Sequence, residues 1–162
     1  MPNIVFKHCL LFEKLFKRML VLFIMKQTRS TGGIVVNSKG QILIVNNKEK
    51  ISTWGFPKGH VKGREADLTT AKREIYEESG IKELKLIKEF ESYKRYKINK
   101  EGGEDKSELK TIFMFLFSTD KKELKPIDLE NPEARWVEKG KVVELLTHSK
   151  DKEFFMMIIK EV

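Results

Sequence analysis

Short apolar blocks separated by polar turns run along most of the chain. Residues 33–36 and 41–45 are rich in β-branched side chains and flank the sequence Asn-Ser-Lys-Gly, so they predict a β-hairpin. Residues 84–98 and 110–118 are longer strand candidates, and the second is almost continuously apolar, which is typical of a central strand. Further elements are expected at 134–137 as a strand and at 142–146 and 154–159 as helices, the last packing its Phe-Phe-Met-Met-Ile-Ile run on the sheet.

A helix is predicted from Asp67, where apolar residues begin to recur at steps of three and four and form one buried stripe. Glu74, Glu77 and Glu78 occupy positions i, i+3 and i+4 on the other side. A solvated, Glu-rich face is the simpler interpretation of an isolated run of this kind. The alternative is a metal site, because Mg²⁺ typically binds through carboxylates, waters and substrate phosphates, and a cation relieves the repulsion between the carboxylates.

The spacing around these carboxylates is more restrictive than a solvated face requires. Seven residues of particular types stand at fixed spacings: Gly59, Glu65, Arg73, Glu74, Glu77, Glu78 and Gly80. If each identity occurs at roughly 6%, all seven arise by chance about a few times in a billion windows. Residues 59–81 resemble the Nudix box, Gx5Ex7REUxEExGU with U an apolar residue, and they match it at every specified position.

The resemblance implies an α/β (α+β) Nudix fold, a mixed β-sheet sandwiched between helices, over residues 25–162. It also implies hydrolysis of a nucleoside diphosphate linked to a further group, with Mg²⁺ or Mn²⁺. The metal ligands it implies are Gly59, through its backbone carbonyl, and Glu74, Glu77 and Glu78. Arg73 lies one helical turn before Glu77 and is expected to orient it. Glu65 is expected either to support the metal site or only to interact favourably with the positive N-terminal end of the helix.

The general base in such enzymes is either a box glutamate or a glutamate in a late loop. Two late candidates lie in the sequence Asp-Leu-Glu-Asn-Pro-Glu-Ala-Arg-Trp, Glu130 and Glu133, and Glu133 is the predicted catalytic one. A loop position beside a proline suits a mobile base, although an exposed loop glutamate is often structural.

The residues before the box, Trp-Gly-Phe-Pro-Lys-Gly-His-Val, resemble the asymmetrical diadenosine tetraphosphate hydrolase branch of the family. By this resemblance Lys58, His60 and Lys110 are expected to contact substrate phosphates. Tyr96, with Tyr93 as the alternative, is expected to contact a phosphate or the adenine. The chain departs from the branch at residues 62–64, where Lys-Gly-Arg replaces the usual acidic residue, Pro and Gly, and this leaves the substrate's register open.

Composition indicates the size of the protein and the kinds of partner it can bind. With 162 residues the chain has the length of one domain, and its net charge of +8 and pI near 9.4 favour an anionic partner, whether polyphosphate, nucleic acid or acidic membrane. Cys9 is the only cysteine, which excludes an internal disulfide and is typical of a reducing cytoplasm.

Residues 1–24 have the spacing of a basic amphipathic helix and are expected to be an extension, or a misassigned start, outside the catalytic fold. Their uninterrupted apolar run, 19–25, is too short to insert stably across a membrane.

The predicted protein is therefore a cytoplasmic Nudix hydrolase that converts diadenosine tetraphosphate to ATP and AMP. The enzyme alternative is a pyrophosphohydrolase acting on RNA 5′ ends or on nucleoside triphosphates, for which a basic chain is equally suitable. A non-catalytic nucleotide-binding sensor is the alternative from another class. Its usual signature is a box that has lost carboxylates, whereas this box has all of them. The sequence leaves the oligomeric state open.

Overall fold

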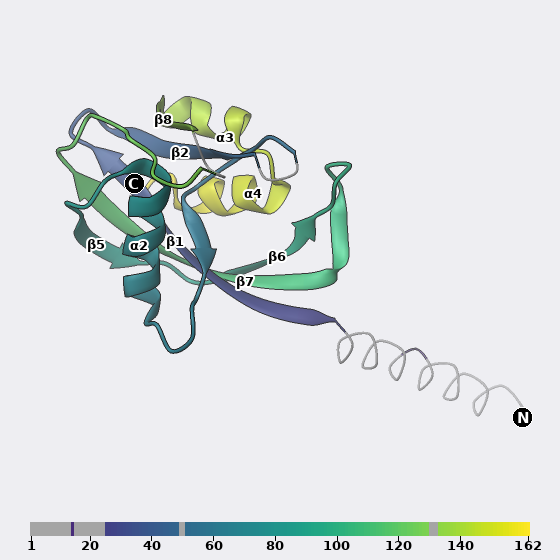
Figure 1. Cartoon of the computed structure of the whole chain (residues 1–162). Helices are drawn as coiled ribbons and strands as arrows, with labels where there is room; N and C mark the ends of the chain where they lie inside the picture. Colours follow the sequence, from purple (N-terminus) through teal and green to yellow (C-terminus); the bar gives the residue numbers. More distant parts are fainter. Residues whose placement is uncertain (1–13, 15–24, 49–50, 130–132) are drawn as a thin grey trace, which may run out of the picture.

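The computed structural model describes residues 14, 25–48, 51–129 and 133–162. One sheet of eight strands dominates this part of the chain, in the order β3-β2-β1-β7-β5, with β4 paired to β1, β6 to β7 and β8 to β2 (Figure 1). The strands are β1 (Lys26–Asn37), β2 (Gln41–Asn47), β3 (Thr53–Gly55), β4 (Lys58–His60), β5 (Lys85–Glu89), β6 (Tyr93–Ile98), β7 (Glu104–Thr119) and β8 (Glu133–Glu138). The helices are α2 (Asp67–Ser79), the 3₁₀ turn η1 (Lys139–Lys141), α3 (Val142–Leu145) and α4 (Ser149–Ile158).

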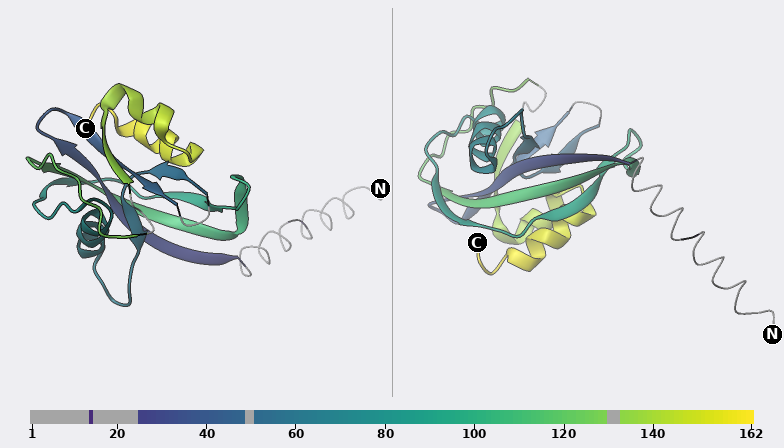
Figure 2. Two further views of the ribbon diagram at one scale, coloured as in Figure 1. Left: turned by 45° about the horizontal axis from the view of Figure 1, so that its top comes forward. Right: turned by 90° about the horizontal axis from the view of Figure 1, so that it is seen from below.

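The sheet is mixed, because β1 runs parallel to β7 while its pairings with β2 and β4 are antiparallel. Helix α2 covers one face, and α3 and α4 cover the other (Figures 1 and 2). Neighbouring residues of β1 show the two faces: Ile34 belongs to the core under α4, and Val35 belongs to the core under α2. The predicted mixed sheet between helices is therefore confirmed.

The predicted hairpin at 33–36 and 41–45 is also confirmed, with Val36 paired to Ile42. The single strand predicted at 84–98 is wrong, because the chain forms two strands, β5 and β6, that pair with successive parts of β7. Residues 90–92 separate them, and a backbone hydrogen bond from Phe90 N–H to Met114 O joins the break to β7. Apolar content alone does not reveal such a break.

The C-terminal helix also differs from its prediction. Helix α4 begins at Ser149 rather than 154, because the His148 side chain accepts a hydrogen bond from the Lys150 amide and caps the helix. Phe154, Phe155 and Ile158 are buried, but Met156 and Met157 are 54% and 71% exposed. A helix buries one stripe only, so the apolar run does not pack on the sheet as a whole.

The expected extension at residues 1–24 lies outside the described residues, apart from Lys14. None of the helices that the structure describes is long and apolar enough to cross a membrane.

Candidate functional site

Helix α2 presents its glutamates to the sheet because a buried stripe and a fixed end hold it in place. Ala71 and Ile75 are fully buried against β1 and β7. The helix ends at Gly80, which has φ +80° and whose amide donates to Tyr76 O. A Cβ at this position would lie 2.4 Å from Lys125 O, so both the conformation and the space require glycine.

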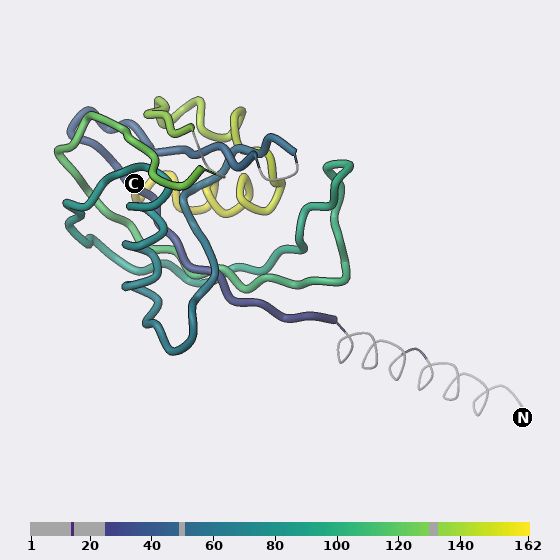
Figure 3. Tube along the Cα trace, in the orientation of Figure 1, coloured from purple at the N-terminus to yellow at the C-terminus, as the bar shows by residue number. Residues whose placement is uncertain are grey.

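Strand β4 brings the first box residue against this helix. It pairs antiparallel with β1, with Gly59 opposite Thr31, and the loop that follows turns the chain into α2 (Figure 3). A Cβ on Gly59 would lie only 2.1–2.3 Å from the carboxylate atoms of Glu74. One residue earlier, the Lys58 amide donates to Glu78 Oε2 at 3.0 Å. The loop and the helix therefore form one compact structure around the carboxylates.

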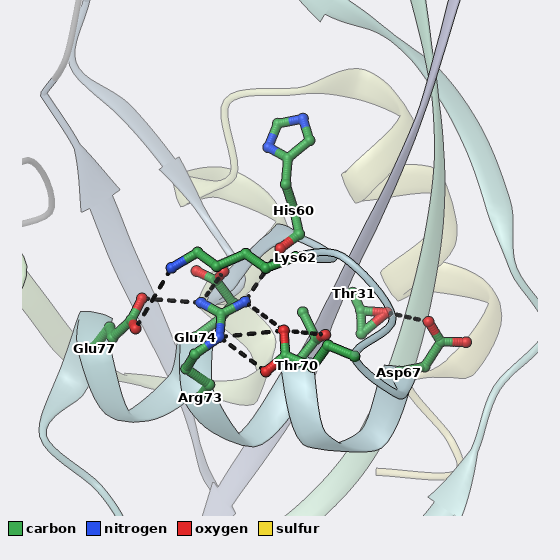
Figure 4. Close-up of polar contacts among 9 residues, drawn as sticks. Thr31, His60, Lys62, Asp67, Thr70, Arg73, Glu74 and Glu77 are labelled. Carbon is green, nitrogen blue, oxygen red and sulfur yellow. Dashed lines mark hydrogen bonds and ion pairs between the residues drawn. The ribbon is translucent and has the colours of Figure 1, made fainter.

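Arg73 connects the carboxylates to one another. Its guanidinium lies 2.6 Å from Glu74 Oε1 and 3.1 Å from Glu77 Oε2, and it also donates to His60 O at 3.1 Å (Figure 4). Three further hydrogen bonds, of 3.0–3.3 Å, join it to Glu65. Hydrogen bonds from Arg73 and then from Thr70 lower the pKa of Glu65 to about 2. Arg73 therefore orients Glu74 as well as Glu77, and Glu65 in turn fixes Arg73.

Glu74 and Glu78 are buried, unlike Glu65 and Glu77. Burial, with Glu74 as a second cause, raises the pKa of Glu78 well above its usual range, and burial also raises the pKa of Glu74. A bound cation would favour their charged forms, and carboxylate and carbonyl oxygens are the ligands that Mg²⁺ prefers. The chemistry of this donor set fits such a metal. Among the described residues no three Asp, Glu, His or Cys side chains converge on one metal position, and the Glu74 carboxylate contacts Arg73.

Gly59, Glu74, Glu77 and Glu78 are among the residues that line a cavity of about 390 Å³. The lining includes the acidic residues Glu74, Glu77, Glu78, Asp128 and Asp151 and the basic residues Lys58, His60, Lys62, Arg95 and Lys110. The volume is in the range of small-molecule sites. An anion in this cavity would therefore meet several cations, and a metal ion that accompanies it would meet carboxylates.

The structure places three predicted substrate residues in the cavity wall. Lys58 Nζ lies 3.0 Å from Asp151 Oδ2, so its charge is already paired. Lys110 Nζ lies 3.8 Å from Glu108 Oε1, and burial lowers the pKa of this lysine. His60 is half exposed, and burial, followed by the charge of Lys110, lowers its pKa.

Other predicted residues lie elsewhere. Tyr96 does not line the cavity, whereas the preceding residue on β6, Arg95, does. Tyr93 is partly buried and stacks on Phe154 at 4.5 Å between ring centroids. Glu133 opens β8 outside the cavity, where its carboxylate accepts hydrogen bonds from Arg135 and Asn46. Glu130 lies outside the described residues.

Arg95, Asp128 and Asp151 line the cavity but were not predicted from the sequence. Asp151 could have been found from the sequence pattern. It lies three and four residues before Phe154 and Phe155, on the stripe that α4 buries. A charged residue on a buried helical stripe indicates a specific partner. Arg95 lies in the strand Tyr-Lys-Arg-Tyr-Lys-Ile, which mixes cations and aromatics without a regular period, and Asp128 lies in a loop, so no periodic pattern marks either residue.

Comparison with known proteins agrees with this geometry. The family model described as NUDIX domain matches residues 26–157. The chain belongs to the Nudix family and is a Nudix hydrolase of nucleoside polyphosphates, as its sequence predicted. Members of this family generally use divalent metal ions.

Three relatives illustrate the range of similarity. An RNA pyrophosphohydrolase of Bartonella henselae is 28% identical over 82% of this chain and 88% of its own length. The asymmetrical bis(5′-nucleosyl)-tetraphosphatase of Rattus norvegicus is 43% identical, over 33% of this chain and 36% of its own. A crystal structure of a C. elegans Ap4A hydrolase binary complex has a TM-score of 0.69 at 18% identity, covering 83% of this chain and 96% of the other. Several further RNA pyrophosphohydrolases are matched over less than half of their length.

Proposed function

We propose that the chain hydrolyses diadenosine tetraphosphate to ATP and AMP. The observation that carries this proposal is a cavity that is lined both by three glutamates of α2 and by Lys58, Arg95 and Lys110. The cations suit the phosphates of the ATP part, and the glutamates suit the phosphate that is attacked. The 43% identity to the rat tetraphosphatase over 53 residues supports the same substrate. We place the enzyme in the cytoplasm, on the basis of its single cysteine.

Each group has a proposed role. Glu74, Glu77, Glu78 and the carbonyl of Gly59 hold Mg²⁺ or Mn²⁺, and Arg73 orients Glu74 and Glu77. The metal, when bound, neutralises phosphate oxygens and lowers the pKa of a water. Lys58, Arg95 and Lys110 orient the remaining phosphates, with His60 at the rim. We propose an α2 glutamate as the general base in preference to Glu133, because the Glu133 carboxylate is bound to Arg135 outside the cavity.

A second candidate function is removal of pyrophosphate from RNA 5′ ends. The relative from Bartonella henselae that carries the name RNA pyrophosphohydrolase is matched over 88% of its length, far more than the rat tetraphosphatase. The net charge of +8 also favours a nucleic acid partner. A triphosphate at an RNA end presents the same phosphoanhydride chemistry to the cavity. Tyr96, which follows the cavity-lining Arg95 on β6, then becomes a candidate for contact with the RNA.

A substrate panel tests these two functions. Diadenosine tetraphosphate, ATP, ADP-ribose and 5′-triphosphate RNA are incubated with Mg²⁺ and in parallel with Mn²⁺, and kcat/KM is measured for each. We expect diadenosine tetraphosphate to exceed a simple nucleoside triphosphate by about tenfold or more, because binding energy from its remote phosphates orients the reacting phosphorus. A comparable preference for triphosphate RNA would replace the first function with the second.

The position of cleavage is tested by isotope labelling. We propose that water attacks the phosphorus that becomes part of AMP, while the cations hold the ATP part as the leaving group. The bond from this phosphorus to the bridging oxygen breaks, the bridging oxygen leaves with ATP, and the oxygen of water stays on AMP. Hydrolysis in ¹⁸O-water followed by mass spectrometry is therefore expected to label AMP. Label in ATP, or two molecules of ADP as products, would contradict this orientation of the substrate.

A further inference from the structure

One buried carboxylate of the C-terminal helix contacts two of the cations that line the cavity. Asp151 of α4 is 1% exposed, and it lines the cavity from the face of the sheet opposite α2. Its Oδ2 lies 3.0 Å from Lys58 Nζ, and its Oδ1 lies 3.2 Å from Arg95 Nε. The Tyr93 hydroxyl donates to Oδ1 at 2.7 Å. Residues of β4, β6 and α4 therefore meet at one side chain.

Asp151 is the shared counterion of two cations. Burial alone would raise its pKa, but Lys58, Arg95 and the hydrogen bond from Tyr93 together lower the pKa to about 2, so the carboxylate is charged at neutral pH. Arg95 Nε is buried and has no hydrogen-bond partner among the described residues, because its N–H is not aligned with the nearby Oδ1. The contact is therefore an ion pair that leaves the guanidinium incompletely satisfied. A phosphate oxygen is a suitable further acceptor for it.

A purely structural role explains this arrangement less well. Phe154, Phe155 and Ile158 continue the buried stripe of α4, and an apolar residue at 151 would extend it without desolvating a charge. Buried ion pairs commonly stabilise a fold no more than well-packed apolar groups do. Here the carboxylate and both cations line the cavity, whereas the aromatic partner Tyr93 does not.

Resting on the proposed function, in which Lys58 and Arg95 meet substrate phosphates, we propose that Asp151 is a positioning residue that fixes both cations before the polyphosphate enters. Without the carboxylate, two neighbouring cations would repel each other and sample several rotamers. With it, their side chains are ordered in advance, so less entropy is lost when the transition state forms. Asp151 also reduces the net positive charge of the wall, which limits ground-state binding of the substrate.

The test compares Asp151→Asn, which keeps shape and removes charge, with Glu153→Gln on the same helix. Glu153 is exposed and pairs only with Lys150 among the described residues, so it controls for loss of one negative charge from α4. Each variant is assayed for kcat and KM on the best substrate of the panel, per folded molecule as judged by circular dichroism. Binding of inorganic tripolyphosphate without metal is measured by calorimetry, and exchange of the Arg95 Nε–H by NMR.

We expect Asp151→Asn to lower kcat by about tenfold or more while KM changes by less than about threefold. Tripolyphosphate should bind at least as tightly as to the wild type, because a negative charge has left the wall. The Arg95 Nε–H should exchange about tenfold faster. Combining Asp151→Asn with Arg95→Gln should lose less activity than the product of the two single losses, since one residue acts through the other. Glu153→Gln should match the wild type in every assay.

Unchanged kcat per folded molecule, together with unchanged exchange of the Arg95 Nε–H, would overturn the proposal. Loss of tripolyphosphate binding would show a collapsed cavity and a structural role instead. If Asp151→Asn does not fold, Tyr93→Phe removes one hydrogen bond to Asp151 from outside the cavity, and it should lower kcat by about threefold at constant KM. If the wild type hydrolyses no member of the panel, the proposed function fails, and the calorimetric and NMR results still decide the role of Asp151.

Discussion

Glu78→Gln is expected to lower kcat by at least about 100-fold while the fold is retained. Glutamine preserves the shape of the side chain, and its carbonyl oxygen can still accept the hydrogen bond that the Lys58 amide donates to Glu78 at 3.0 Å. What the substitution removes is a buried carboxylate, whose charged form a bound cation would favour. Binding of a hard divalent cation depends on the charged carboxylate, whereas packing of the surrounding side chains depends mainly on its shape.

Thermal melting in the presence and absence of Mg²⁺ separates the metal from the chemistry. A metal that binds the folded state raises the melting temperature, and we expect this increase in the wild type to be reduced in Glu78→Gln. Glu83→Gln is a matched control, because Glu83 is exposed, pairs with Lys121 and lies outside the cavity. It should retain both turnover and the metal-dependent increase. Near-normal turnover in folded Glu78→Gln would refute the assignment of this residue as a metal ligand.

The part of the site that the sequence predicted is local in the chain. Glu74, Glu77 and Glu78 lie within two turns of one helix, so spacing alone places them on one side of it. Arg73 is also close in sequence to Glu77, and the predicted pairing is present at 3.1 Å. Gly59 was placed by the motif, and the structure adds that its missing side chain makes room for Glu74.

The part that the sequence did not predict depends on how distant elements meet. The resemblance placed Tyr96 at the substrate, but alternate residues of a strand face opposite sides, and β6 presents Arg95 to the cavity instead. A register shift between Tyr96 and Lys97 further changes which later residues face inward. Asp151 lies 93 residues from Lys58 and reaches it only because α4 packs across the sheet. No local pattern encodes these contacts.

Gly59→Ala is expected to lower kcat by about 100-fold with little change in the fold. Gly59 has an ordinary negative φ, so alanine is compatible with its backbone. The added Cβ would nevertheless lie 2.1–2.3 Å from the Glu74 carboxylate, which must move. That carboxylate is the end of a flexible side chain, so the movement costs little stability, but it breaks the 2.6 Å contact with Arg73. A displacement of about 1 Å in a catalytic group is enough to cost about 100-fold in rate.

Gly140→Ala is the matched control for this substitution. A Cβ at Gly140 meets no atom within 4 Å, and the residue also has no positive φ, so the same chemical change occurs outside the cavity lining without a clash. Both variants are compared with the wild type by circular dichroism, melting temperature and kcat on the best substrate of the panel. We expect all three proteins to fold and only Gly59→Ala to lose turnover. Full activity in Gly59→Ala would show that the position of the Glu74 carboxylate is not critical, and Glu74 would then be removed from the proposed metal ligands.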